Sequence, residues 1–368
     1  MTIKFYNPIG GRKKPLNLSS LFLVNPNVIL KLSGTSISGM MKEAGYESLY
    51  KRIQNPNDES RILRATHDMA AILDLPKCIV DALSGDTEVR EIFSKMGVWE
   101  VFALGAKLHE EQWPQPLKFC IGVERSTHQS LILFHERKYD EALALLMESP
   151  LVCLLLWPEA IDILHKRNSL DALLPLRGMV ALEVILSRLA GYDAHTCHSL
   201  AISNSLVLDV LPTTLTEDKN PTALFFKWIK RQIDLPTISA ILNAKKASKL
   251  TLDESLLKRW SNGTHMPSEK ALKSLLEAFF DDPVAKDIWM RYYGTKCLNF
   301  IGYQIQYIQK VMNTAATTEL LKDSYRPWPD MPFGFKTTET WFENRYPYWF
   351  EYHSKQIIGE GMKPSLNN

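Results

Sequence analysis

Cysteine is sparse in this chain of 368 residues, which contains only five. The five lie far apart and form no CxxC pair: Cys78, Cys120, Cys153, Cys197 and Cys297. An odd number of scattered cysteines excludes a disulfide framework or a zinc knuckle as the main stabilising element. The pattern instead favours buried thiols in a reducing compartment.

Long hydrophobic runs are also missing. The apolar run at residues 151–157 is far shorter than the roughly 20 residues that a membrane crossing requires. Another apolar run, at residues 21–32, is interrupted by Asn25, Pro26 and Asn27, and it begins too far from the start of the chain for a signal peptide. We therefore expect a cytoplasmic protein with no membrane contact.

Charge of one sign does not dominate the chain, whose net charge is +2. Hydrophobic residues make up 45% and charged residues 23%, which excludes disorder as a description of the whole chain. Its length exceeds what one hydrophobic core usually serves, so two or three domains are expected. A nucleic-acid-binding surface would have to show itself by clustered charge, because the total is nearly neutral.

Complete catalytic and metal-binding motifs are absent too. Residues 34–41 have the glycine spacing of a phosphate loop but lack the Lys and Ser or Thr that would engage phosphate and magnesium. His67 stands before an aspartate but has no earlier His partner, and the cluster His195, Cys197 and His198 has no second ligand group. For that cluster we expect a buried thiol beside hydrogen-bonded histidines. The sequence thus predicts no metal ion and no cofactor; it leaves catalytic activity open and favours its absence.

Helical periodicity is what the sequence does contain. From residue 36 to residue 310 apolar residues recur three and four apart, and no sustained β alternation is visible, so the main class is all-α. Helix starts are expected at Pro76, Glu88, Trp99, Tyr139, Pro158, Pro175, His195 and Pro221. An apolar helix is expected at residues 288–312. The first 35 residues, with a basic turn and two β-favouring runs, predict an extended arm or a hairpin.

The most specific local pattern lies in residues 256–276. Trp260 offers a large apolar side chain to a small core, and Gly263 can turn the chain after a helix. Pro267 or Ser268 can start the next helix. Three leucines then follow at helical spacing: Leu272, Leu275 and Leu276.

This pattern resembles the XRE (Cro/C1-type) helix-turn-helix family, over about residues 235–280 only. The resemblance implies a positioning helix at residues 237–242 and a recognition helix at residues 253–259 that enters the major groove of DNA. In one respect the chain departs from the family: the connection at residues 243–251 is longer than the usual tight turn. That departure affects the register of the recognition helix.

Basic residues are concentrated in the same segment. Between residues 227 and 273 there are ten basic residues and four acidic ones, the balance expected for a surface that contacts phosphates. The residues expected to contact bases or phosphates are Thr251, Ser255, Lys258 and Arg259, and those expected on the DNA backbone are Lys245, Lys246 and Lys249. Against this, Asp253 and Glu254 would repel phosphates unless they cap the helix or accept from cytosine. A helical hairpin with a solvated basic face is the competing interpretation.

Aromatic residues are dense near the carboxyl end, in residues 325–352. They suit either a loop strapped over a helical core or a surface that binds a partner. We accordingly divide the chain into an arm at 1–35, a helical domain at 36–220, a helix-turn-helix-like module at 221–282, and a carboxyl-terminal helix with an aromatic, Pro-rich segment at 283–368. The predicted fold is a mainly α, irregular multi-helix protein with an embedded helix-turn-helix.

Two classes of function follow from these features. In the first, the protein binds double-stranded DNA and regulates transcription or recruits a partner. In the second, it is a helical scaffold for protein–protein interaction, or a subunit of a bacterial multi-protein complex, with weak or no DNA binding. A protein partner at the aromatic segment and a homo-oligomer fit either class.

Overall fold

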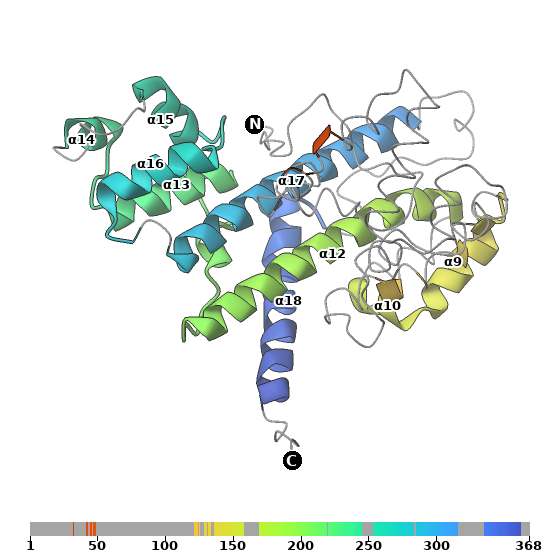
Figure 1. Ribbon diagram of the computed structural model, residues 1–368. Helices are drawn as coiled ribbons and strands as arrows, with labels where there is room; N and C mark the ends of the chain where they lie inside the picture. Colours follow the sequence, from red (N-terminus) through yellow and green to blue (C-terminus); the bar gives the residue numbers. More distant parts are fainter. Residues whose placement is uncertain are drawn as a thin grey trace, which may run out of the picture. The chain divides into compact units, whose positions relative to one another are not determined.

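The computed structural model describes residues 136–157, 169–218, 220–244, 253–282, 285–315 and 335–361, with a few short pieces between residues 32 and 133. In these parts the regular structure is helical and no residue belongs to a strand, which confirms the mainly α class (Figure 1). Nearly all of the expected arm at 1–35, and the helix starts expected at Pro76, Glu88, Trp99 and Pro158, lie outside the described residues. Within the described part of the chain, no helix is long and apolar enough to cross a membrane.

By its internal contacts the chain divides into two compact units. One consists of Leu16–Val184, and the other of Met1–Pro15 with Ile185–Asn368. The boundary falls inside helix α12, Ser169–Ser199. The four-segment division expected from the sequence stays a prediction.

In the first unit two short helices meet at a single capping serine. Helix α9, Tyr139–Glu148, begins at the predicted start, and helix α10, Pro150–Leu155, follows it. The Ser149 side chain accepts from the Val152 amide, and Pro150 at the first helical position has no N–H that would need a partner. The local sequence thus ends one helix and starts the next.

Helix α12 corrects two of the expected helix starts. It continues through Pro175 and through His195, so neither residue begins a helix. A proline inside a helix removes one backbone hydrogen bond and crowds the preceding turn, which disfavours the helix locally. Residues 178–187 are all buried, and this burial offsets the local loss.

In the second unit, helix α13 is the central element. It spans Pro221–Gln232, begins at the predicted start, and contacts the short 3-10 helix η2, Val207–Val210, and the long helix α17, Lys286–Ala315. The Asn299 side-chain amide of α17 donates to the Thr222 hydroxyl of α13 at 2.9 Å, and both residues are fully buried. The helix expected at residues 288–312 is confirmed as part of α17.

The aromatic segment also forms a helix. From Thr338 it is helix α18, Thr338–Gly361, so the expectation of a loop strapped over the core is wrong for this part of the chain. Four of its aromatic side chains are 0% exposed: Trp341, Phe342, Tyr346 and Trp349. Their spacing of one, four and three residues places them on one face, which is buried as a core stripe. These four side chains are therefore not available to contact a protein partner.

A buried carboxylate connects three elements of this unit. Asp193 of α12 accepts from the Ser205 hydroxyl and from the amides of Leu206 and Val207, at 3.1 and 3.3 Å, at the start of η2. It also accepts from the Tyr346 hydroxyl of α18 at 2.7 Å. Burial, and then the nearby Asp193, raise the pKa of Tyr346 well above its usual value, so the phenol stays protonated and donates.

Candidate nucleic-acid interface

In the described residues between 237 and 280 lie three short helices, each preceded by a capping side chain. They are α14 at Ile238–Asn243, α15 at Glu254–Ser261 and α16 at Glu269–Phe279. Thr237 accepts from the amide of Ala240, Asp253 from that of Leu256 and Ser268 from that of Ala271. A side-chain oxygen at each of these positions satisfies an amide that the first helical turn leaves without a partner. Of the alternatives left open by the sequence, Asp253 caps α15, and Ser268 rather than Pro267 starts α16.

Trp260 holds α15 in place. It is 1% exposed and packs edge-on against Phe226 of α13, with ring centroids 5.9 Å apart. Its neighbour Leu257 is 0% exposed, and so is Ile241 of α14, which contacts α15. The predicted role of Trp260 as the large side chain of a small core is confirmed. One face of α15 is therefore fixed inside the unit.

Gly263 ends α15 for two reasons, of which only one is visible in the sequence. Its φ is +68°, a left-handed conformation that glycine adopts without strain. A side chain at this position would also overlap with Asn220, whose side chain caps α13. The predicted turn is confirmed, and the close approach to Asn220 adds a tertiary requirement for glycine.

The opposite face of α15 is exposed and collects three of the predicted contact residues. Ser255, Lys258 and Arg259 are all exposed, together with Glu254 and Asn262. Residues three and four positions apart are neighbours on a helix, so Ser255 lies beside Lys258 and Arg259. The fold thus brings these three together, while Leu257 and Trp260 point the other way.

Charges on this face are partly compensated. Lys258 Nζ lies 2.7 Å from the Glu254 carboxylate, and the Ser255 hydroxyl donates to Asp253 at 2.8 Å. The Leu256 amide, then the Ser255 hydroxyl, lower the pKa of Asp253, with a smaller contribution from Arg259. Arg259 makes no ion pair with any described side chain. Its guanidinium is therefore the strongest positive feature of the face.

The other predicted contact residues are Lys245, Lys246, Lys249 and Thr251, which lie outside the described residues. Elsewhere in the segment, two of the basic side chains have acidic partners. Lys227 pairs with Glu217 at 3.2 Å, and Lys273 lies 3.8 Å from Glu277. These exposed pairs contribute little to stability, but they reduce the positive field near α13 and α16.

The three residues of the cluster at the end of α12 differ in their surroundings. Cys197 is buried, as predicted, and donates to the Asn204 carbonyl, while burial and the nearby Asp193 raise its thiol pKa to about 11. His195 and His198 are exposed, and their imidazole rings make no hydrogen bond with described residues, so the expectation of hydrogen-bonded histidines is wrong. Within the described part of the chain, no three His, Cys, Asp or Glu side chains gather around a common point.

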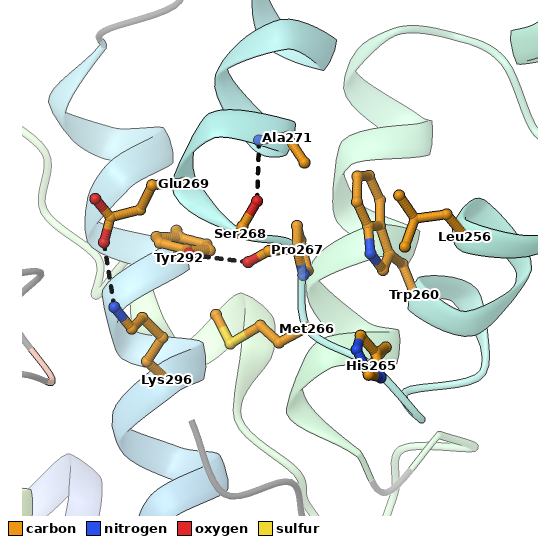
Figure 2. Close-up of a pocket in the computed structure, with 10 residues that line it drawn as sticks. All are labelled: Leu256, Trp260, His265, Met266, Pro267, Ser268, Glu269, Ala271, Tyr292 and Lys296. Carbon is orange, nitrogen blue, oxygen red and sulfur yellow. Dashed lines mark hydrogen bonds and ion pairs between the residues drawn. The ribbon is translucent and has the colours of Figure 1, made fainter. Parts of the chain in front are cut away.

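A pocket of about 480 Å³ borders α15 on another side, and no motif in the sequence indicates it. It lies over residues 265–268, with Leu256 and Trp260 on one side and Glu269, Tyr292 and Lys296 on the other (Figure 2). Two of these residues come from α17, far along the chain, so only the folded structure assembles the walls. The Tyr292 hydroxyl donates to the Pro267 carbonyl at 2.9 Å and fixes the floor.

Comparisons of the chain with family models, with curated proteins and with solved structures give no match. Function therefore has to be inferred from the residues themselves.

Proposed function

We propose that the protein binds double-stranded DNA through the exposed face of α15 and acts as a regulatory or recruitment protein. The observation that carries the proposal is the division of α15 into two faces. Leu257 and Trp260 fix one face in the core, so Ser255, Lys258 and Arg259 are held toward solvent on a helix that cannot rotate. Preorganised side chains on a helix that fits the major groove are the usual means of reading base edges.

Each of these side chains has a defined role in the proposal. The Arg259 guanidinium presents paired donors, which suit guanine O6 and N7 or a phosphate. The Ser255 hydroxyl donates to a base edge or a phosphate when it leaves Asp253. Lys258 adds a phosphate contact, and so do the predicted backbone lysines Lys245, Lys246 and Lys249.

The acidic residues at the start of α15 limit the affinity. Asp253 is held by the Leu256 amide, so its charge remains beside the proposed surface. Glu254 competes with DNA for Lys258, because the two side chains already form an ion pair. We expect binding that depends on Arg259 more than on Lys258 and that weakens steeply as salt is added.

A second function, as a protein-interaction scaffold, is favoured by exposed apolar side chains around η2. Leu200 is 37% exposed, Leu208 46% and Leu215 92%. Side chains of this kind suit a protein interface better than a DNA surface. In that function the Leu208→Asp substitution would release a co-purifying partner, whereas substitutions on α15 would not.

Duplex binding by the full-length chain tests the first proposal. We would measure fluorescence anisotropy of a labelled random duplex at several salt concentrations, for the unmodified chain and for the Lys258→Ala/Arg259→Ala double variant. Each lost phosphate contact lowers the slope of log affinity against log salt by about 0.9, so the double variant should lose up to about two units of slope. Its melting temperature should stay the same, because both side chains are exposed.

The matched control is Lys336→Ala/Lys355→Ala, which removes two exposed positive charges far from α15 in sequence. It should keep nearly all of the affinity and slope of the unmodified chain. Equal losses in both double variants would mean that net charge, and not the α15 face, controls binding. No measurable duplex binding at low salt would overturn the proposal.

A further inference from the structure

The pocket beside α15 contains a buried polar atom without a partner. Trp260 lines the pocket, and its indole nitrogen Nε1 is buried and makes no hydrogen bond. Figure 2 shows this nitrogen on the edge of the ring that faces Pro267, which also lines the pocket. Buried indole N–H groups usually have an acceptor, because leaving the donor without one destabilises the folded state.

The charges in the pocket compensate each other. Lys296 Nζ lies 3.2 Å from the Glu269 carboxylate, and its ammonium also lies 5.5 Å from the centroid of the Tyr292 ring. The pair therefore offers no uncompensated charge that would attract an ion. The remaining lining is mixed: Leu256, Met266, Pro267 and Ala271 are apolar, and His265 and Ser268 are polar.

Size and shape favour a small aromatic molecule. A volume of about 480 Å³ lies in the lower part of the range of roughly 300–1,000 Å³ that is typical of small-molecule sites. The Trp260 and Tyr292 rings, which are 1% and 2% exposed, lie on opposite sides of the pocket. Met266, which is unbranched and adaptable, can shift to admit a ligand edge toward the indole nitrogen.

We propose that this pocket binds a small, planar, uncharged molecule whose carbonyl oxygen accepts a hydrogen bond from Trp260 Nε1. An aromatic amide is the chemical class that meets all of these requirements. Its ring fills the apolar part of the pocket, and its carbonyl supplies the missing acceptor. Its N–H groups can donate to Glu269. The inference does not depend on DNA binding, because the pocket walls and the exposed face of α15 are different surfaces.

Three probes of similar size distinguish the ligand classes: benzamide, benzoate and toluene. We would titrate each, up to millimolar concentration, into the full-length chain labelled with ¹⁵N, and follow the indole N–H signals. The Trp260→Phe variant assigns the Trp260 signal. Benzamide should move that signal downfield, because the proton enters a hydrogen bond, and it should bind at least tenfold more tightly than benzoate or toluene.

Two variants separate pocket binding from a general effect on the fold. Ala271→Leu fills the pocket from α16 and should weaken benzamide binding at least tenfold, while the indole donor remains. Ala144→Leu makes the same change at an exposed position of α9 and should leave binding unchanged. In Trp260→Phe the donor is lost but an aromatic ring remains, and binding should weaken about tenfold. If that variant does not fold, Ala271→Leu still tests the site.

Several results would overturn the inference. An unmoved Trp260 signal at millimolar benzamide would mean that the indole nitrogen is not a ligand contact. Benzoate binding as tightly as benzamide would show an anion site instead of a site for an uncharged ligand. Equal binding of toluene would show an apolar cavity in which the donor has no role.

Discussion

The hydroxyl of Tyr346 offers a direct test of how α18 is attached to the rest of its unit. Tyr346 is fully buried, and its hydroxyl donates at 2.7 Å to Asp193, which also holds the start of η2. The Tyr346→Phe substitution removes this one donor and keeps the ring in the core. Hydrogen bonds to charged groups contribute about 1.5–3 kcal/mol each, so the free energy of unfolding should fall by about that amount.

Tyr346→Phe is a better test than removal of the Asp193 carboxylate. Asp193→Ala would leave the Ser205 hydroxyl, two backbone amides and the Tyr346 hydroxyl without their acceptor. At about 1–3 kcal/mol for each buried donor, the total approaches the 5–15 kcal/mol that stabilises a typical domain. That variant would be too unstable to measure, whereas Tyr346→Phe should still fold.

Urea unfolding followed by far-ultraviolet circular dichroism is the assay, with Tyr348→Phe as the control on the same helix. Tyr348 is 41% exposed, and Arg345 lies over its ring, which phenylalanine preserves. We expect the control to change the free energy of unfolding by less than about 0.5 kcal/mol. Equal losses in the two variants would refute the reasoning, because the buried hydrogen bond would then contribute nothing specific.

The same substitution should change the response to alkaline pH. Because burial raises the pKa of Tyr346 in the folded state, the unfolded chain loses the phenolic proton first, near its usual value of about 10. The contribution of Tyr346 to stability is therefore complete below that pH and falls as pH rises further. Tyr346→Phe should show a shallower loss above about pH 10 than the unmodified chain. An unchanged slope would contradict the assigned role.

Three further predictions concern acid stability, the turn after α15, and DNA affinity. Burial lowers the pKa of His353, so the unfolded chain takes up a proton first and stability falls as pH drops below about 6.5. The melting temperature of His353→Gln should therefore fall less on acidification than that of the unmodified chain. The melting temperature of the control, the exposed His198→Gln variant, should follow the unmodified chain. Gly263→Ala should lower the free energy of unfolding by about 2 kcal/mol, because it strains the left-handed backbone and displaces the Asn220 side chain that caps α13. At Gly359 a side chain meets open space, so the control Gly359→Ala should not destabilise the protein in the same urea titration. Glu254→Gln should strengthen duplex binding several-fold at low salt, and unchanged anisotropy titrations would contradict the proposed α15 surface.

Local signals in the sequence account for the caps of α15 and α16 and for the turn between them. Trp260 is buried, Gly263 turns the chain with a positive φ, and Ser268 caps α16, as their chemistry predicts. The capping role of Asp253 follows the same rule, because a short side chain with an oxygen satisfies the first amides of a helix wherever the helix packs. These features depend on neighbours within a few residues, and the sequence contains those neighbours.

Tertiary packing decided the features that the local sequence predicts wrongly or does not predict. Pro175 favours a helix start, yet burial of the following residues keeps α12 continuous. The aromatic stripe of α18 is buried because it meets surfaces that the sequence cannot identify, and Tyr346 finds Asp193 across 153 positions. The pocket next to Trp260 exists because α17 brings Tyr292 and Lys296 to it.

By itself, then, the sequence determined the helical class, the caps and turn around α15, and which of its residues are apolar enough to be buried. The folded structure decided which charges are compensated, which aromatic residues are core, and where a cavity remains. The physical reason is the range of the interactions. Caps, turns and helical periodicity act over a few residues, whereas burial and ion pairing depend on segments that meet only after folding.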